Sequence, residues 1–440
     1  MFDESAAVDD PARRLAVDCL TAGIRAADPA TVVADTVALD GTDLVIEGDR
    51  YDLATYEEVL VVGGGNAAAT AAAALEGLLG EWIDRGAVVT DNPVDTERIE
   101  VLPGDHPVPS QRGVESTRSM LEIAASAGPD DLVVVVVTGG GSALMPAPAD
   151  GLDLADLQAA TEALLRSGAS IDEINAVRKH CSDLKGGQLA AATAPATTLG
   201  LVFSDVVGNR LDVVASGPLT PDPSTFGEAL AVLDRYDVDV PDSVRSRLER
   251  GAAGDVPETP GEGDDVFDSV GQYVLADGNT ALRAAASVAR DAGHEPLVLS
   301  SRIRGEARDV AKVHAGIAEE CVATGQPVDP PAVLLTGGEA TVTIRGDGVG
   351  GPNQEFVLSS ALEVSEPGIT VAAVDTDGID GTTEAAGAIA TAETATPREA
   401  ALAALADNDA GGFLDERDAL LRTGPTGTNV NDLRVFVVDE

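Results

Sequence analysis

The sequence predicts an α/β protein with two domains, the first built on a doubly wound parallel sheet and the second, smaller, on a mixed sheet. A run of β-branched residues without alternation, Leu132–Val137, is typical of a strand covered on both faces. Apolar strand-like runs alternate with helical stretches along the chain, and several of them end in glycines. A length of 440 residues suits two cores.

The first half of the chain contains the expected elements of a Rossmann-like, parallel sheet. A helix over Pro11–Ala27 carries one apolar stripe and is capped by Asp9 or Asp10. A strand or hairpin follows, and then strands and helices alternate. The expected elements are a hairpin at Leu44–Tyr51, a strand that ends at Gly63, a helix from Ala67, a strand at Gly86–Thr90, and helices at Ser110–Ala127 and Leu154–Arg166.

The domain boundary is expected in a loose, acidic stretch over Val240–Val266, which the sequence predicts as an exposed loop. The predicted organisation is residues 1–250 for the N-terminal domain, 251–268 for an acidic linker and 269–440 for the C-terminal domain. An alternating strand at Thr341–Ile344 favours a mixed sheet in the second domain.

The charge balance is extreme, with 28 Lys plus Arg against 75 Asp plus Glu and a formal net charge of −47. Such a chain repels nucleic acid and anionic membranes. The acids are scattered among apolar segments and 44% of residues are hydrophobic, which favours a folded protein with an acidic surface over a disordered one. This composition resembles proteins of salt-accumulating archaea.

We therefore expect the protein to be halophilic and to lose structure on desalting. In molar salt the Debye length is about 3 Å, which screens the repulsion among surface carboxylates. Thermal unfolding followed over a KCl series tests this expectation. A melting temperature independent of KCl would contradict it.

Cys19, Cys181 and Cys321 lie far apart, which argues for a reducing compartment and against a disulfide frame or a zinc site. The acidic start of the chain lacks an apolar leader, and no apolar run approaches the length of a membrane span. A cytoplasmic protein is expected, and a homodimer is left open.

Two glycine turns follow predicted strands, Gly63–Gly64–Gly65–Asn66 and Gly139–Gly140–Gly141. The first matches G-x-G-x-x-A, so it could bind a dinucleotide, hold another anion at a helix N-terminus, or serve structure alone. The second lets backbone N–H groups approach an anion, to which the Ser142 hydroxyl adds a donor. No P-loop motif occurs.

Cations gather beside the second turn. Two of the three lysines, Lys179 and Lys185, lie with Arg178 in the segment 171–190. In a chain so poor in lysine, this clustering indicates a charged ligand. His180 in the same segment could be a phosphate ligand, a general base or a residue on the helix surface.

Polar residues also mark strand ends. Ser204 and Asp205 follow a second apolar strand, and strand ends face ligands in open α/β sheets. Asp377 and Asp380 lie three residues apart in a glycine loop, where they could present carboxylates to Mg²⁺ or form an Asx turn.

Six motifs together resemble the glycerate 2-kinase family with its MOFRL-type C-terminal domain. They are TGGGSALMPAP, INAVRKHCSDLKGGQLA, SDVVGNRLDVVASGPLTPDPSTF, LLTGGEATVTIRGDGVGGPNQE, DTDGIDGTTEAAGA and TGPTGTNVNDL. The resemblance covers about Pro11 to Val438. It implies ATP-dependent phosphorylation of D-glycerate at its 2-hydroxyl, with Mg²⁺, in a cleft between the two domains.

This resemblance guides the assignment of site residues. Lys185, Arg178 and Asp205 are expected to be catalytic, and Asp205 and Asp377 to bind Mg²⁺. The glycines and Asn66 of the two turns are expected to hold the nucleotide. D-glycerate is expected to contact Ser142, Asn175, Ser204, Glu339, Asn353 and Glu355.

Three positions depart from the family pattern. Asn66 stands where the family has a lysine proposed to act in catalysis, Pro352 where it commonly has arginine, and Asn209 where it usually has aspartate. A lost cation can lower a phosphoryl transfer rate by about 10³-fold; Arg178, Lys185 and Arg210 are candidates to substitute. Two alternatives stay open. The GGGNAA turn permits an NAD(P)-dependent hydroxypyruvate reductase, and Asn66 with Pro352 motivates a non-catalytic paralogue that binds a sugar acid.

Overall fold

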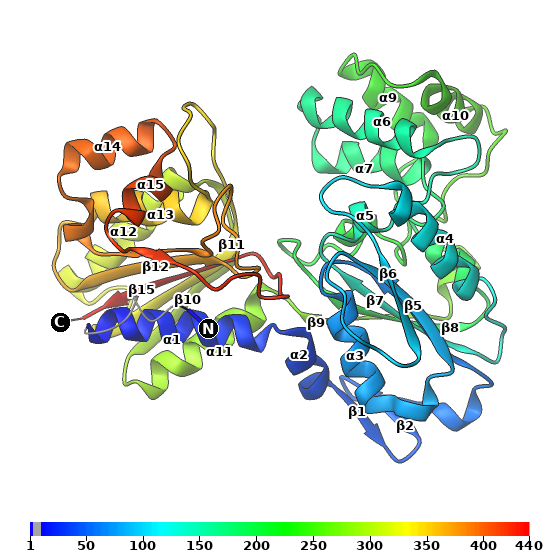
Figure 1. Ribbon diagram of the computed structural model, residues 1–440, viewed down its shortest axis with the longest axis horizontal. Coiled ribbons are helices and arrows are strands. Elements are labelled where there is room, and N and C mark those ends of the chain that lie inside the picture. Colours follow the sequence, from blue (N-terminus) through cyan, green and yellow to red (C-terminus); the bar gives the residue numbers. More distant parts are fainter. Residues whose placement is uncertain (3–9, 440) are drawn as a thin grey trace. The chain divides into compact units, whose positions relative to one another are not determined.

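The structure is a computed structural model that describes residues 1–2 and 10–439, and its chain divides into two compact units. The first consists of Val32–Leu275, and the second combines Met1–Thr31 with Ala276–Glu440 (Figure 1). Among the described residues, no helix combines the length and apolar character that crossing a bilayer requires.

The unit Val32–Leu275 is built on a six-stranded sheet with the order β6-β5-β4-β7-β8-β9. From β6 to β8 every neighbouring pair is parallel. Every residue of β4 and β7 is buried, as expected for strands covered on both faces. The strands are β4 (Val59–Gly64), β5 (Arg85–Thr90), β6 (Ile99–Pro103), β7 (Leu132–Thr138), β8 (Thr197–Phe203) and β9 (Val270–Ala276).

The strand order contains a topological switch point. From β4 the chain moves outward to β5 and β6, and then returns to place β7 on the other side of β4. The loops after β4 and β7 therefore lie at the switch point on the carboxyl edge of the sheet, where open α/β sheets bind ligands.

Helices α3 (Ala68–Leu79) and α4 (Gln111–Ala124) lie on opposite faces of this sheet (Figure 1). Met120 and Ala124 of α4 pack on the same core as Val133 and Val135. This arrangement confirms the predicted doubly wound domain. A small antiparallel sheet of β1 (Val37–Asp40), β2 (Asp43–Ile46) and β3 (Asp49–Asp52) contains the predicted hairpin.

Four helices form a second, smaller core beside the sheet, in which Leu164, Val177, Phe226, Leu233 and Leu248 pack together. They are α6 (Leu154–Ser167), α7 (Ile171–His180), α9 (Phe226–Arg235) and α10 (Asp242–Ala252). Helix α2 (Pro29–Thr36), the short helices α5 (Gly141–Leu144) and α8 (Gln188–Thr193), and the 3₁₀ turns η2 (Leu53–Thr55), η3 (Gly80–Trp82), η4 (Val214–Ser216) and η5 (Asp265–Phe267) complete the unit.

The prediction of an exposed loop over residues 240–266 was wrong in its first half. Helix α10 occupies Asp242–Ala252 and buries Val244 and Leu248, which are four residues apart on one face. Its other positions are mostly charged, so the polar composition concealed a short amphipathic helix.

The other unit has a six-stranded sheet with the order β10-β11-β15-β12-β13-β14. The pair β10–β11 is parallel and the other pairs are antiparallel, which confirms the predicted mixed sheet. The predicted strand at Thr341–Ile344 was wrong, because β11 ends at Thr341. The strands are β10 (Glu295–Glu306), β11 (Ala332–Thr341), β12 (Ile369–Asp375), β13 (Gly387–Ala390), β14 (Leu420–Leu421) and β15 (Asp432–Val438).

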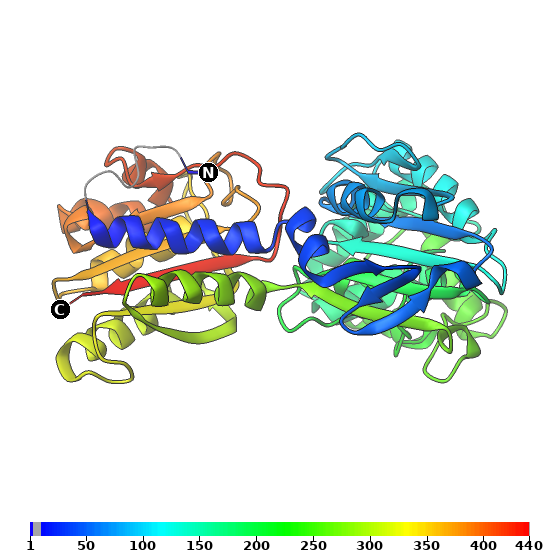
Figure 2. The same ribbon diagram turned by 90° about the horizontal axis from the view of Figure 1, so that it is seen from below.

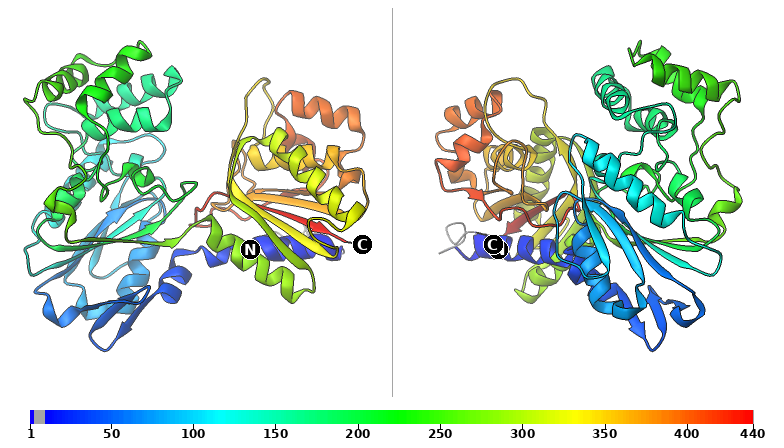
Figure 3. Two further views of the ribbon diagram at one scale, coloured as in Figure 1. Left: turned by 180° about the vertical axis from the view of Figure 1, so that it is seen from behind. Right: turned by 45° about the vertical axis from the view of Figure 1, so that its right-hand side comes forward.

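Helices cover both faces of this sheet. Helices α1 and α11 lie side by side on one face (Figure 2), and α12 and α13 cover the other (Figure 3). The Asp10 carboxylate caps α1, as predicted, whereas Asp9 lies outside the described residues. The helices are α1 (Pro11–Ala26), α11 (Gly278–Asp291), α12 (Ala307–Thr324), α13 (Pro352–Glu363), α14 (Arg398–Ala406) and α15 (Ala410–Asp415), with the 3₁₀ turn η6 (Ala392–Ala395).

The predicted boundaries assign each of two elements to one domain, whereas each of them packs with the other unit. Helix α1 contacts α11 and β15 of the C-terminal sheet, and β9 is the last strand of the N-terminal sheet. The organisation into domains at residues 1–250, 251–268 and 269–440 stays a prediction. Cys19, Cys181 and Cys321 are buried free thiols.

A buried carboxylate organises the start of α13. Asp380, 1% exposed, accepts hydrogen bonds from the backbone N–H groups of Asn353 (3.0 Å) and Gln354 (2.9 Å). Pro352 stands at the first position of this helix, where its missing N–H costs nothing. Burial, with the nearby Asp432 carboxylate opposing the backbone donors, raises the pKa of Asp380 to about 7.

We predict that Asp380→Asn gains stability relative to the wild type as the pH rises from about 4 to about 7. In this window the folded state still holds a proton that the unfolded carboxyl has already lost. Each pH unit therefore lowers the free energy of unfolding of the wild type by up to about 1.4 kcal/mol through this group. Thermal unfolding of both proteins at constant high salt measures the difference. Asp309→Asn, at an exposed carboxylate, is the control, and a difference independent of pH would contradict the prediction.

Candidate active site

The two predicted glycine turns lie side by side at the switch point of the parallel sheet. Gly63–Gly65 end β4 and Gly139–Gly141 follow β7, and the Asn66 N–H donates to the Gly139 carbonyl (2.9 Å). A Cβ on Gly140, at φ +74°, would overlap the Asn66 amide oxygen, and one on Gly139 would overlap the Asp205 carboxylate. Residues from three strand ends thus meet here.

Asn66 is itself engaged by an acid. Its amide Nδ2 donates to both carboxylate oxygens of Asp91 (3.1 and 3.0 Å), which follows β5. A negative charge therefore stands beside the first glycine turn. Ser204 is buried and donates to the Val206 carbonyl (3.3 Å), while Asp205 lies against the second turn.

A cavity of about 300 Å³ adjoins the second turn. It is lined by proline and apolar side chains together with hydroxyls and cations. Among the residues that the structure describes, no Asp or Glu lines it, although the protein carries 75 acids. We call this the cationic cavity; its lining residues are His106, Pro107, Pro109, Gly140, Ser142, Ala143, Pro146, Leu157, Thr161, Arg178, Ser182 and Lys185.

Arg178 and Lys185 supply the positive charge of the cationic cavity. Lys185, 6% exposed, donates from Nζ to the Ser142 carbonyl (2.9 Å). The Arg178 guanidinium makes no hydrogen bond or ion pair with the residues that the structure describes. Burial, reinforced by Arg178, lowers the pKa of Lys185 from 10.5 to about 7, and burial also lowers the pKa of Arg178. Two desolvated cations without an acidic partner favour binding of an anion.

A second cavity of about 350 Å³ lies on the other side of α7 and has the opposite character. Five acids line it, and its cations are paired: Lys179 with buried Asp222 (3.2 Å), Arg210 with Asp172 and Asp212, and Arg235 with Glu173. Of the cations proposed to replace the missing lysine and arginine, Arg210 is thus neutralised locally.

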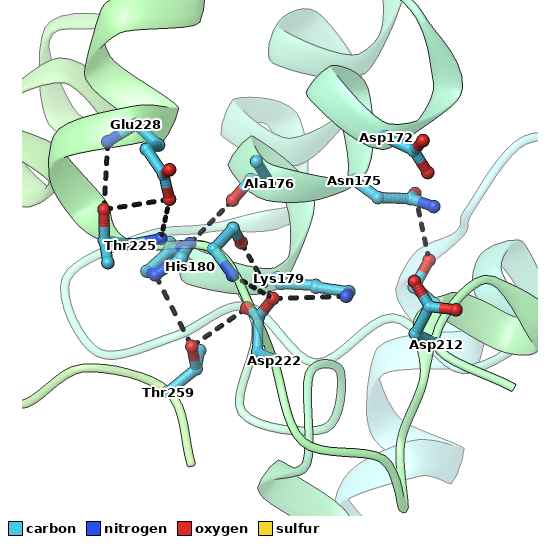
Figure 4. A network of polar contacts seen from close by, with 12 residues as sticks. Asp172, Asn175, Ala176, Lys179, His180, Asp212, Asp222, Thr225, Glu228 and Thr259 are labelled. Atoms are coloured by element: carbon cyan, nitrogen blue, oxygen red, sulfur yellow. Dashed lines mark hydrogen bonds and ion pairs between the residues drawn. The ribbon is translucent and has the colours of Figure 1, made fainter. Parts of the chain in front are cut away.

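Asn175, on α7 with Lys179 (Figure 4), lines the second cavity and not the one lined by Ser142, Arg178 and Lys185. It is 4% exposed, and its Oδ1 accepts a hydrogen bond from the Ser216 hydroxyl (3.4 Å). The structure therefore brings the expected substrate contact Ser142 together with the expected catalytic residues Arg178 and Lys185, and places Asn175 in the other cavity.

His180 has a structural environment. It is 1% exposed, its Nδ1 lies 2.6 Å from the Ala176 carbonyl oxygen, and its Nε2 lies 3.1 Å from a Glu258 carboxylate oxygen (Figure 4). The interpretation as a helix-surface residue was wrong, because the ring packs against Phe226 in the helical core. His180 does not line the cationic cavity.

In the other unit, Asn353 and Glu355 are buried and hydrogen-bonded to neighbouring side chains. Asn353 Nδ2 donates to Asp380 and Asp432, while Glu355 accepts from Arg308 Nε (2.9 Å). Glu339 is exposed at the end of β11, and desolvation, followed by the Asp432 charge, raises its pKa. Their contact with a substrate stays a prediction.

The carboxylates expected to hold Mg²⁺ form no complete site by themselves. Among the described residues, no three His, Cys, Asp or Glu side chains are grouped to hold a metal ion. Asp377 accepts from the Ile379 N–H (2.8 Å), which is the Asx turn that the sequence analysis left open. Asp205 and Asp377 belong to separate units, and each offers a carboxylate of the kind that Mg²⁺ accepts alongside waters and phosphate oxygens.

Sequence reasoning missed several residues of this region. Thr161 and Ser182 line the cationic cavity, and Ser216 lies 2.7 Å from the Ser142 hydroxyl. Thr161 lies in the amphipathic helix α6, and the sequence pattern of this helix does not distinguish Thr161 as a cavity residue. Ser216 stands before Gly217 and Pro218, a turn signal that could have drawn notice.

The fold and this geometry define an α/β protein with a small-anion cavity beside the switch point of a doubly wound sheet. Residues 15–249 match a domain of unknown function, DUF4147, and residues 332–432 match the MOFRL family. The chain is 37% identical to a glycerate 2-kinase of Pyrococcus horikoshii, with 97% of each chain covered. It is also 41% identical to a protein of Agrobacterium vitis that carries the name of a hydroxypyruvate reductase, covering 86% of this chain and 87% of that one.

A crystal structure of a glycerate kinase from Thermotoga maritima superposes with a TM-score of 0.85 at 35% identity, covering 97% of this chain and 99% of that one. The chain belongs to the glycerate 2-kinase family.

Anion binding in the cationic cavity should weaken as the pH rises above about 7. The folded-state pKa of Lys185 is about 7, so at higher pH the anion must draw a proton onto the amine, and affinity falls by up to tenfold per pH unit. Calorimetry with D-glycerate, whose charge is constant above pH 6, at pH 6 to 9 and constant KCl measures this.

Lys185→Arg is the matched control, because its guanidinium stays charged throughout this range. It should bind with little dependence on pH. Equal pH profiles for both proteins would show that Lys185 does not titrate on binding.

Proposed function

We propose that this protein transfers the γ-phosphoryl group of ATP to the 2-hydroxyl of D-glycerate. In this reaction an O–P bond forms at the substrate oxygen, the bridging O–P bond of ATP breaks, and the hydroxyl proton is released. The proposal rests on membership of the glycerate 2-kinase family, and the cationic cavity with its two unpaired cations is the observation that carries it.

Phosphoryl transfer requires positioning and neutralisation of charge more than covalent chemistry. Arg178 offers a planar fork suited to two oxygens of a carboxylate or phosphate, and Lys185 supplies a point charge. The Ser142 hydroxyl and the backbone at Gly140 can donate to the same anion. Because prolines and Leu157 line the rest of the cavity, they limit the water that competes for these donors.

Asp205, which follows β8, is proposed to orient the hydroxyl that accepts the phosphoryl group, because its carboxylate lies against Gly139 of the second glycine turn. When bound, Mg²⁺ would neutralise phosphate charge, with Asp205 and Asp377 as the proposed protein ligands. The glycines of the two turns, with Asn66, are proposed to hold the nucleotide. Glu339, Asn353 and Glu355 stay proposed substrate contacts.

The hydroxypyruvate reductase alternative is less well supported by the site. A dinucleotide at the first glycine turn would need an acid at the end of a neighbouring strand for its ribose. Asp91 is that acid, and both of its oxygens already accept from Asn66. Incubation with NADH and hydroxypyruvate at molar KCl should therefore give no oxidation of NADH.

Several properties stay predictions from the sequence. They are the use of Mg²⁺, halophilic behaviour, a cytoplasmic location and a homodimer. The non-catalytic alternative, which Asn66 and Pro352 motivate, predicts stabilisation by D-glycerate without formation of ADP.

Lys185→Ala should lower turnover at least tenfold, because the lost cation neutralises phosphate in the transition state. The assay couples ADP formation from ATP, Mg²⁺ and D-glycerate at molar KCl, and NMR identifies the phosphoglycerate isomer. Lys312→Ala, at an exposed lysine of α12, is the matched control. An unchanged rate in Lys185→Ala would remove this lysine from the site.

A further inference from the structure

Three consecutive residues beside the cationic cavity adopt left-handed backbone conformations. Ala215, Ser216 and Gly217 have φ values of +48°, +63° and +66°. Only glycine adopts this region readily, and Ala215 and Ser216 are both buried. Strained backbone of this kind persists where the surrounding structure enforces it, and it is frequent at functional sites.

Backbone hydrogen bonds fix this segment to the turn that carries Lys185. The Gly186 N–H donates to the Ser216 carbonyl (3.0 Å), and the Gly187 N–H donates to the Gly217 carbonyl (2.8 Å). These two bonds hold the strained segment against the chain that follows Lys185.

The strained conformation directs the Ser216 hydroxyl between the two cavities. Its Oγ lies 2.7 Å from the Oγ of Ser142, which lines the cationic cavity, and it donates to Asn175 Oδ1 (3.4 Å) in the second cavity. Ser216 is thus the link between the two predicted substrate residues that the structure separates.

We propose that Ser216 is a positioning residue that holds the Ser142 hydroxyl in place to donate to the substrate anion. A hydroxyl has one proton, and when Ser142 directs its proton at an anion, its oxygen can accept from Ser216. Rotation of the Ser216 hydroxyl then moves its single proton from Asn175 Oδ1 to the nearer Ser142 oxygen, and this change needs no movement of heavy atoms. Such a chain of donors strengthens the last hydrogen bond. This inference rests on the proposed function.

Two substitutions separate the hydroxyl from the backbone strain. Ser216→Ala and Ser216→Gly both remove the hydroxyl, and each should lower kcat/KM for D-glycerate by about tenfold, the scale of one hydrogen bond. Ser216→Gly should melt at a higher temperature than Ser216→Ala, because glycine adopts a φ of +63° without strain. A residue that served stability alone would give activities that follow the melting temperatures.

The decisive experiment is a double-mutant cycle with Ser142→Ala, in which kcat/KM is measured for the wild type, Ser142→Ala, Ser216→Ala and the double variant. If Ser216 acts through Ser142, its removal in the Ser142→Ala background costs less than about twofold. A full tenfold loss in that background would overturn the proposal.

Thr198→Val is the matched control. Thr198 lies at the start of β8, away from the ligand edge of the sheet, and donates to the Thr193 hydroxyl (2.8 Å). The variant therefore also loses one member of a buried hydroxyl pair. Its kcat/KM should equal that of the wild type, and a tenfold loss would show that any buried hydroxyl pair has this effect.

Calorimetric affinity for D-glycerate, measured for the same variants, separates this inference from the proposed function. If the wild type binds D-glycerate without forming ADP, the proposed function fails and the cycle is read from the dissociation constants. If the wild type neither binds nor phosphorylates D-glycerate, both proposals fall.

Discussion

Two cations that have no acidic partner among the described residues, the buried Lys185 and the half-buried Arg178, are the constraint on which this account depends. In a protein with a net charge of −47, an arginine or lysine finds a carboxylate almost everywhere on the surface, as Arg210 and Arg235 do. Arg178 and Lys185 do not, and burial lowers the pKa of both. Removing these two charges from water without an acidic partner is unfavourable. An anion bound beside them would supply the missing negative charge and so lower the free energy of the folded protein.

The parallel sheet creates the place for this cavity. Because β4 and β7 are parallel neighbours at the switch point, their glycine turns meet there, and the chain after β7 enters α5 with Ser142 at its start. Helix α7, held in a separate helical core, then brings Arg178 to one side and Lys179 to the other. One helix thus separates a cavity without acids from one rich in them, and local pairing decides which cations stay available.

Much of the fold could be predicted from the sequence, because its strongest signals are local. The all-buried strand β7, the Asp10 cap and the amphipathic α6 follow from pattern and capping chemistry. Helix α10 was missed because Val244 and Leu248 are its only large apolar residues and stand among charged and small polar ones. The packing of α1 on the C-terminal sheet could not be predicted, since an apolar stripe shows that a helix is buried and not where.

The site was harder to predict than the fold, for a physical reason. Residue type and strand position correctly grouped Ser142, Arg178 and Lys185, which follow one another along the chain. Spacing could not show that Asn175 faces the opposite side of α7, or that Lys179 is neutralised by Asp222, forty-three residues away. Pairing in space, which sequence does not display, decides which charges act on a ligand.

The most direct measurement is a crystal structure of the protein grown at molar KCl with D-glycerate. The account predicts the carboxylate or hydroxyl oxygens of D-glycerate within hydrogen-bond distance of Arg178 and Lys185, in the cavity beside Gly140 and Ser142. D-glycerate bound elsewhere, with these two cations turned toward acidic side chains, would contradict it.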